Sequence, residues 1–216
     1  SDIQNVPNAG DASDRCPVSF PKWDRYCTQA ASGRFRFERK MTYRLCMACG
    51  GRLRAGREEG KRRWRCARCG WTFYGNPIPA AVALVIKGRK VLLGRRAAAP
   101  YAGTWDLPGG FLEGDETPEV ALRRELKEEL GVGIRSARLL GFFHETYGPR
   151  GFPILAVVYE AQLAGDRLVT ASDVSELRWF DRARLPFREI RFPSVRKALR
   201  WFAVRRPRNR SRSRGR

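Results

Sequence analysis

Three closely spaced glutamates, Glu125, Glu128 and Glu129, are the residues in this chain whose types and spacing most directly suggest chemistry. On a helix, at about 100° per residue, they occupy an arc of about 100° beside a stripe of leucines. Neighbouring carboxylates repel one another unless a cation neutralises them, and Mg²⁺ favours carboxylate oxygens and bridges to substrate phosphates. The spacing therefore predicts a divalent-metal site on one helix face, against the alternative of a solvated acidic surface.

The helix that would carry these glutamates has recognisable ends. Thr117 is a favoured N-cap, Pro118 suits the first helical position, and Gly131 suits the C-cap. We therefore expect a helix between Thr117 and Gly131, with one apolar face for a core and an adjacent face for the carboxylates.

The segments on either side of this helix follow strand and helix periodicities. Residues 80–95 predict a β-hairpin, and residues 97–110 predict a loop rich in glycine and proline. Beyond the helix we expect three strands, over residues 139–147, 154–163 and 177–180, and a last helix capped by Ser194. Together these segments predict an α+β domain of ordinary size.

The surroundings of the glutamates match a longer motif. Nine residues occupy every fixed position of the Nudix box, Gly-x5-Glu-x7-Arg-Glu-U-x-Glu-Glu-x-Gly-U, where U is apolar: Gly110, Glu116, Arg124, Glu125, Leu126, Glu128, Glu129, Gly131 and Val132. The approach to the box, Gly-Thr-Trp-Asp-Leu-Pro-Gly-Gly over residues 103–110, also resembles that of the Nudix hydrolases. Over about residues 80–204 this resemblance implies the Nudix fold, a mixed sheet sandwiched between helices.

The resemblance to the Nudix family also implies roles for individual residues. Mg²⁺ or Mn²⁺ would be held by Glu125, Glu128, Glu129 and the backbone of Gly110. The ion would polarise phosphoryl oxygens and orient the attacking water. Arg124 would orient the glutamates by ion pairing, and Glu116 would support the loop before the helix. Glu176, in a later acidic loop, is a candidate base or further metal ligand, and an ordinary loop acid is the alternative.

Four other residues are candidate substrate contacts: Arg95, Arg96, Trp105 and Tyr147. Arginine pairs with phosphate in a fork, and aromatic rings stack on bases. A solvated strand end explains the two arginines equally well, and packing beside the glycine-rich loop is the alternative for Trp105. The substrate side of the site is therefore defined less sharply than the metal side.

Four cysteines form a second group with ligand spacing. Cys46 and Cys49 are separated by two residues, as are Cys66 and Cys69, and sixteen residues lie between the pairs. Four thiolates at this spacing predict a closed, structural Zn²⁺ site, which has no open position for catalysis. Close cysteine pairs favour a metal over disulfides, and hence a reducing compartment such as the cytoplasm.

The cysteine module contains nine basic and two acidic residues, together with interleaved tryptophans. Such a composition suits nucleic acid, but we favour a scaffold or homodimerisation role. The order of ribbon, hairpin and Nudix box resembles the NADH pyrophosphatase subgroup. The further motif of that subgroup, Ser-Gln-Pro-Trp-Pro-Phe-Pro-x-Ser, is replaced by His-Glu-Thr-Tyr-Gly-Pro-Arg-Gly-Phe-Pro over residues 144–153. The implied substrate is therefore a nucleoside-diphosphate-linked small molecule such as ADP-ribose, NADH or FAD.

The remaining expectations come from charge and composition. The formal net charge is +21, and seven arginines lie in residues 205–216, which predicts a disordered tail that attracts nucleic acid non-specifically. No apolar run is long enough to span a membrane. The expected organisation is an irregular extension (1–43), a zinc ribbon (44–75), a Nudix domain (78–204) and the basic tail. Two alternative functions stay open: RNA decapping, and nucleic-acid binding with a vestigial Nudix domain.

Overall fold

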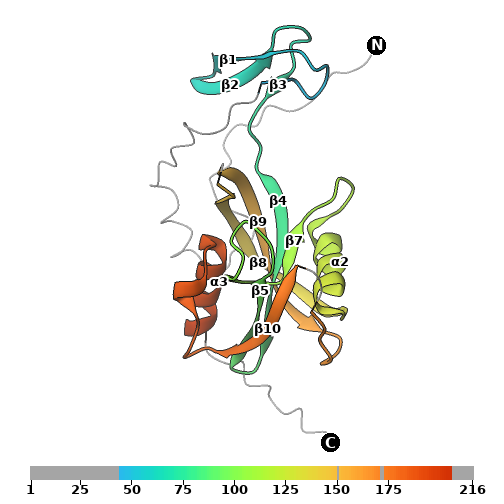
Figure 1. The fold of residues 1–216 in the computed structure, drawn as a ribbon, viewed down its shortest axis with the longest axis vertical. Helices are drawn as coiled ribbons and strands as arrows, with labels where there is room; N and C mark the ends of the chain where they lie inside the picture. Colours follow the sequence, from blue (N-terminus) through green and yellow to red (C-terminus); the bar gives the residue numbers. More distant parts are fainter. Residues whose placement is uncertain (1–43, 150, 171–172, 206–216) are drawn as a thin grey trace, which may run out of the picture. The chain divides into compact units, whose positions relative to one another are not determined.

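The computed structural model describes residues 44–149, 151–170 and 173–205. They form a small three-stranded ribbon and a larger α+β domain, each of which we describe by itself (Figure 1). The predictions made for residues 1–43, and for the tail beyond Arg205, lie outside the described residues.

The ribbon is an antiparallel sheet in the order β1-β2-β3, made of Leu53–Glu58, Lys61–Cys66 and Thr72–Phe73. Glu59 and Gly60 join β1 to β2, and both have positive φ (49° and 74°), as the tight turns that match strand twist require. The buried core comprises only Cys46, Leu53 and Cys66, with Trp64 and Trp71 packed beside it. So small a core stabilises little by itself, which makes a metal the expected source of stability.

The larger domain contains a mixed sheet in the order β10-β5-β4-β9-β8. Strands β4 and β9 pair in parallel, and every other pair in the sheet is antiparallel. Two short strands pair alongside, β6 with β5 and β7 with β4. The bounds are β4 Ile78–Lys87, β5 Lys90–Arg96, β6 Trp105–Asp106, β7 Gly109–Phe111, β8 Ile134–Tyr147, β9 Phe152–Leu163 and β10 Val174–Asp181.

Two helices cover this sheet on opposite sides, α2 (Pro118–Leu130) and α3 (Pro193–Val204), as Figure 1 shows. The alternation of strand side chains accounts for the layers. Val157 and Tyr159 of β9 join the core beneath α2, while Glu160 points the other way and pairs with Arg205 at the end of α3. A single 3₁₀ turn, η2 (Phe187–Glu189), precedes α3. The predicted class, a mixed sheet between helices, is confirmed.

The expected loop over residues 97–110 is partly wrong, because it includes β6 and the start of β7. The cause is the short pairing of β4 with β5, which joins only Ile86 to Val91 and Lys87 to Lys90. The first half of β4 would otherwise be an open edge, and β7 pairs with it. The last helix also begins two residues earlier than expected, at Pro193, with Phe192 rather than Ser194 as its N-cap.

Among the described residues, no helix is both long enough and apolar enough to cross a membrane. The longest, α2, has 13 residues and carries charge along most of its exposed surface.

Candidate active site and metal centre

Helix α2 positions the three glutamates, and its ends are fixed as the sequence predicts. The Thr117 hydroxyl accepts a hydrogen bond from the N–H of Val120 at 3.4 Å, and Pro118 is the first helical residue. Gly131 ends the helix with φ 69°, and its N–H donates to the Lys127 carbonyl at 3.0 Å. The face bearing Ala121, Leu122, Leu126 and Leu130 is buried against the sheet, which places the carboxylates on the adjacent face.

Arg124 connects the acidic residues to one another. Its guanidinium forms a bidentate ion pair with the Glu116 carboxylate, through hydrogen bonds of 2.7 and 2.8 Å. It also donates to Glu125 at 2.9 Å and to Glu128 at 3.1 Å, and to the Phe111 carbonyl at 3.0 Å. Because one cation contacts three carboxylates, Arg124 offsets part of their mutual repulsion and fixes their orientation.

Two glycines of β7 allow the backbone to approach the glutamates. A Cβ on Gly110 would lie 2.4 Å from Oε1 of Glu125, so a side chain at this position would displace the carboxylate. Gly109 has φ 135°, and a Cβ there would lie 2.2 Å from the Ala81 carbonyl oxygen. Its N–H donates to Oε2 of Glu129 at 2.9 Å. The glycine pair therefore forms a cradle in which backbone groups meet carboxylates.

The charges in this cradle need a cation to balance them. Burial raises the pKa of Glu129 to about 8 against the lowering effect of the Gly109 N–H, and the neighbouring Glu125 raises it further. Burial also raises the pKa of Glu125, although Arg124 opposes the rise. Carboxylate oxygens facing a space without side chains are the donors that a hard divalent cation prefers, so the residues present fit such an ion.

Glu125 and Glu129 line a cleft of about 400 Å³, a size typical of small-molecule sites. Four more acids of the cleft wall, Asp106, Glu113, Glu145 and Asp173, were not predicted from the sequence. A larger cavity of about 1190 Å³ exists elsewhere in the domain, but none of its lining residues belongs to the Nudix box. We therefore place the candidate site in the smaller cleft, which Glu125 and Glu129 of the Nudix box line.

Aromatic side chains form the other wall of this cleft, around Tyr147. Its ring stacks on Phe192, with centroids 6.0 Å apart and planes inclined by 8°. Phe111 meets Tyr147 edge-on at 5.4 Å and is 38% exposed, and Tyr101 meets it edge-on at 6.1 Å. The cleft thus joins carboxylates to an aromatic wall against which a nucleotide base can pack.

Arg96 reaches the same cleft but is already occupied by protein groups. Its guanidinium donates to Asp106 at 3.2 Å, to the Tyr147 hydroxyl at 3.0 Å and to the Pro100 carbonyl at 3.3 Å. It also lies over the rings of Tyr147 and Phe192, at 5.8 and 5.7 Å from their centroids. Burial raises the pKa of Asp106 to about 7, and Arg96 opposes that rise. In this arrangement Arg96 positions the aromatic wall.

Six predicted site residues are not among those that line the cleft: Glu116, Arg124 and Glu128 of the Nudix box, and Arg95, Trp105 and Glu176 elsewhere. Side chains alternate along β5, so Arg95 and Arg96 point to opposite faces of the sheet. Arg95 lies 3.6 Å from Glu176 and 5.7 Å from the centre of the Trp105 ring. Glu176 also pairs with Arg178, and the buried Trp105 packs edge-on against Phe180 at 4.9 Å. The packing alternative for Trp105 agrees with this placement.

The strand pattern contained a signal for one of the residues that sequence reasoning missed. Glu145 lies two residues after the buried Phe143 on β8, hence on the same face, and only 6% of it is exposed. An acid at an inward position of a strand is unusual enough to mark a site. Its carboxylate accepts the N–H of Ser194 at the start of α3, at 3.0 Å, while burial raises its pKa.

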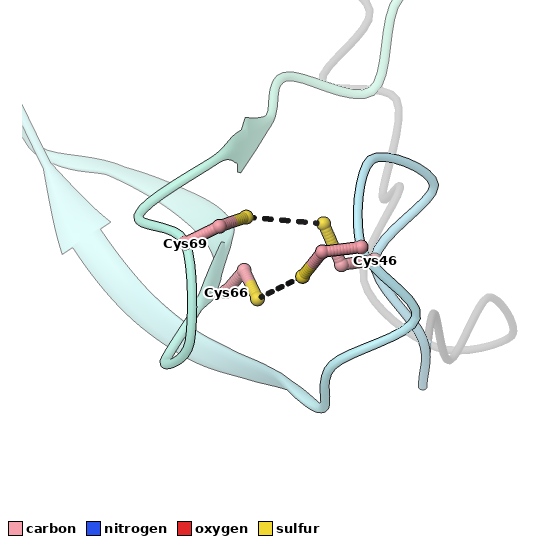
Figure 2. A group of neighbouring side chains, drawn as sticks. Cys46, Cys66 and Cys69 are labelled. Atoms are coloured by element: carbon pink, nitrogen blue, oxygen red, sulfur yellow. Dashed lines mark hydrogen bonds between the residues drawn. The ribbon is translucent and has the colours of Figure 1, made fainter.

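The four cysteines of the ribbon converge, and their sulfurs all lie within 4.8 Å of one another. The side chains of Cys46, Cys66 and Cys69 point toward one another (Figure 2). The Sγ atoms of Cys46 and Cys69 lie 3.7 Å apart, and those of Cys49 and Cys66 lie 3.6 Å apart. A glycine with positive φ follows each Cys-x-x-Cys segment, Gly50 (69°) after Cys49 and Gly70 (76°) after Cys69. The N–H of each glycine donates to the carbonyl of the first cysteine of its segment, Cys46 or Cys66. This arrangement is able to hold a metal ion.

The thiol pKa values support metal binding by the cysteines. The backbone N–H of Cys69 lowers the pKa of Cys66 to about 6. For Cys69 the backbone N–H of Trp71 has a lowering effect, but the hydrogen bond with Cys49 and burial raise the pKa to about 12. Adjacent thiols divide their protons in this way because they cannot all ionise without a cation, and a bound divalent ion would keep all four as thiolates.

The comparison with known proteins agrees with the geometry. The NUDIX domain family matches residues 77–202, more than half of the chain. The chain therefore belongs to the Nudix family and is a Nudix hydrolase, as the box predicted.

Two relatives show where in the family the chain lies. The chain is 35% identical over 117 residues to a protein named ADP-ribose pyrophosphatase from Methanocaldococcus jannaschii, and this alignment covers 54% of the chain and 69% of the relative. It is 32% identical over 166 residues to a protein named NAD-capped RNA hydrolase NudC from Deinococcus radiodurans, and this alignment covers 73% of the chain and 56% of the relative. The chain spans about half the length of the NAD-capped RNA hydrolases that it matches.

Solved structures give the same result. A NUDIX hydrolase from Nitrosomonas europaea aligns with a TM-score of 0.61 at 27% identity, over 76% of this chain and 92% of that protein. A MutT NUDIX hydrolase from Burkholderia pseudomallei aligns with a TM-score of 0.53 at 31% identity, over 58% of this chain and 97% of that protein.

Proposed function

We propose that the chain hydrolyses a diphosphate bond in a nucleoside-diphosphate-linked small molecule, with Mg²⁺ or Mn²⁺ held by Glu125, Glu128 and Glu129. The observation that carries the proposal is the cradle, in which the missing side chain of Gly110 leaves room for the Glu125 carboxylate. The Gly110 carbonyl is a further candidate ligand. Ions of this kind polarise phosphoryl oxygens and make bound water a better nucleophile.

The surrounding residues have supporting roles in this proposal. Arg124 fixes the orientation of Glu125 and Glu128 through hydrogen bonds, and Glu116 anchors Arg124 through two more. The N–H of Gly109 fixes one oxygen of Glu129 and leaves the other for the ion or for a water proton. The carboxylates that would hold the ion are thus kept in place by packing and hydrogen bonds before substrate binds.

The aromatic wall favours a substrate that carries a planar base beside its diphosphate. Phe111 and Tyr147 lie on the same cleft as Glu125 and Glu129, so a base that stacks on the rings would place the adjoining phosphates toward the carboxylates. ADP-ribose, NADH and FAD all have this form. The name of the Methanocaldococcus jannaschii relative makes ADP-ribose the first substrate to test.

One observation favours a second candidate, removal of a nucleotide cap from RNA. The Deinococcus radiodurans relative, named as an NAD-capped RNA hydrolase, matches 73% of this chain, which is a larger share than residues 77–202. The similarity therefore extends outside the Nudix domain, where the ribbon lies. A capped RNA would present the same base and diphosphate to the cleft.

A panel assay tests both candidates. The purified protein is incubated with Mg²⁺ and ADP-ribose, NADH, FAD, a dinucleoside polyphosphate or NAD-capped RNA, and a phosphatase releases phosphate from each monophosphate product. We expect hydrolysis of at least one free nucleotide, and none without a divalent ion. Hydrolysis of capped RNA at a much higher kcat/KM than that of NADH would favour the second candidate, and no hydrolysis of any substrate would reject both.

For the ribbon we propose a structural Zn²⁺ ion bound by Cys46, Cys49, Cys66 and Cys69. The four sulfurs supply a complete tetrahedral set, so no position stays open for a substrate. Because thiolates of this kind persist in reducing surroundings, we further propose that the protein works in the cytoplasm. A homodimer formed through the ribbon is a separate proposal, and sedimentation of the purified protein tests it.

A further inference from the structure

We propose that one face of the ribbon sheet binds the backbone of a single-stranded nucleic acid. We call it the basic face; it comprises Arg54, Lys61, Arg63, Arg65 and Tyr74. The proposal does not depend on the hydrolase activity, because it concerns a different module. It also differs from non-specific attraction by the arginine-rich tail, because the residues of the basic face are held in register by a folded sheet.

The register of the strands separates the two faces of the ribbon. Leu53 lies opposite Cys66 and Ala55 opposite Trp64, and Leu53, Cys66 and Trp64 belong to the small core around the cysteines. Side chains alternate along a strand, so the positions between them point to the other face. There Arg54 lies opposite Arg65, Gly56 opposite Arg63, and Glu58 opposite Lys61.

The pairing of Arg54 with Arg65 supports the proposal together with the ring of Tyr74, because Arg57 and Arg62 form a second opposed pair on the other face. Like charges directly opposite each other on a sheet destabilise it, since their Cβ atoms lie only about 4.5–5.5 Å apart. Both side chains are exposed, and within the described part of the chain neither forms an ion pair with a carboxylate. A tetrathiolate zinc would have a net charge of about −2, which would leave the module strongly basic. An anionic partner would remove this repulsion.

Arg63 and Tyr74 add an aromatic element to the basic face. The Arg63 guanidinium lies 5.0 Å from the centre of the Tyr74 ring and donates to the Tyr74 carbonyl at 3.0 Å. Tyr74 is 54% exposed. Gly56 lies opposite Arg63 and has no side chain to cover it, and Arg63 itself is half-buried. Cations beside an exposed ring are the combination by which proteins bind single strands, through phosphates and stacked bases.

Charge complementarity selects this occupant over a second copy of the chain. A copy docked on the basic face through the same residues would bring two sets of cations together, which electrostatics opposes. The exposed ring favours a single strand over a duplex, in which the base faces are already stacked. An acidic protein would satisfy the charge but has no planar bases for Tyr74, and the test below includes it as an outcome.

The test uses the full chain and two matched double variants. Arg54→Ala with Arg65→Ala removes an opposed arginine pair from the basic face. Arg57→Ala with Arg62→Ala removes the other opposed pair of the same two strands, on the opposite face. Fluorescence anisotropy with a labelled oligouridine of about 12 nucleotides measures affinity at several salt concentrations. Zinc content and kcat/KM on a small nucleotide confirm that both modules remain folded.

We expect the Arg54/Arg65 variant to bind less tightly and to flatten the slope of log affinity against log salt by about 1.4, since each lost contact with a single strand contributes about 0.7. The Arg57/Arg62 variant should change the slope by less than half as much. Equal effects of the two variants, or no effect of the first, would overturn the proposal. So would competition by polyglutamate as strong as that by oligouridine at equal charge. If the alanine pair loses zinc, the single variant Arg65→Gln takes its place with Arg62→Gln as its control, and the expected flattening of the slope is about 0.7.

Discussion

The cysteines of the ribbon and the carboxylates of helix α2 are both candidate metal ligands, but they are built differently. The cysteine sulfurs lie within 4.8 Å of one another, and Cys46 and Cys66 are buried. The carboxylates contact Arg124 or the N–H of Gly109, Glu125 and Glu129 line a cleft, and the Glu128 side chain is 58% exposed. We call the four cysteines the closed set, because their ligand atoms face one another. We call Glu125, Glu128 and Glu129 the open set, because protein groups hold them on one side and leave the other side accessible. A closed set suits a structural ion, and an open set suits an ion that binds a substrate.

Glu128→Gln tests the open set and should have the largest effect. The change removes a metal-binding charge, so kcat should fall by several orders of magnitude with Mg²⁺. The exposed side chain should leave the fold intact. The measurement is kcat on the best small substrate, and Glu58→Gln in the ribbon hairpin is the control with the same chemical change. Near-normal turnover of Glu128→Gln would remove the proposed metal site from α2.

Cys66→Ser tests the closed set. Protein purified without chelator should contain about one Zn²⁺ per chain, and the variant should contain almost none, because serine is not a thiolate ligand. Elemental analysis measures this directly, and Cys16→Ser, outside the two pairs, should retain the metal. The Cys66→Ser variant should hydrolyse a small nucleotide at nearly the normal rate if the two sets are independent. Loss of that activity would show that they are coupled.

Gly110→Ala sharpens the description of the open set. The new Cβ would lie 2.4 Å from a Glu125 oxygen, so the carboxylate must move. Because a displacement of about 1 Å in such a site costs up to about 100-fold in rate, we expect a 10- to 100-fold loss of kcat/KM. The metal concentration for half-maximal rate should also rise. Gly114→Ala, where a Cβ would meet nothing within 4 Å, is the matched control and should be close to normal.

The smallest expected effect concerns the pH dependence of stability. Burial raises the pKa of Glu145, so its contribution to stability is complete below the unfolded value of 4.5 and is lost as the pH rises. Glu145→Gln should therefore gain stability relative to the wild type between about pH 5 and pH 8. Denaturant unfolding of the Nudix domain at both values measures the difference.

Glu160→Gln provides a control with the opposite sign. Burial raises the pKa of Glu160, but hydrogen bonds from Arg205 and Arg138 outweigh that effect and lower it. The ionised carboxylate therefore stabilises the fold above its unfolded pKa, and the glutamine variant should lose stability at neutral pH. The same trend in both variants would contradict this account of the two carboxyl groups.

The sequence predicted those parts of the molecule whose cause is local. The ends of α2 follow from Thr117, Pro118 and Gly131, and the convergence of the cysteines follows from their spacing. The fold class followed from the Nudix box, which is a match to a known family and not a derivation from periodicity. Strands β8, β9 and β10 occur where they were expected, with earlier starts.

The parts that could not be predicted depend on pairing between distant segments. Strand β7 exists because the first half of β4 lacks another partner on that side. Glu145 and Phe192 reach the cleft from β8 and from the residue before α3, and no local pattern places them beside Glu129. Arg95 and Glu176 were expected at the site, but they pair with each other outside the cleft, because adjacent residues of β5 face opposite ways.

The fixed ends of helix α2 make its length matter more than most of its side chains. Thr117 and Gly131 tie it at both ends, and a Cβ on Gly131 would lie 2.4 Å from Cγ2 of Val169. One residue inserted inside the helix would turn everything beyond it by about 100°, so leucines would meet the cleft and glutamates the core. An insertion in the exposed turn at Gly88 would rotate nothing. During evolution this domain can therefore change in the length of its hairpins, whereas insertions and deletions in α2 are excluded.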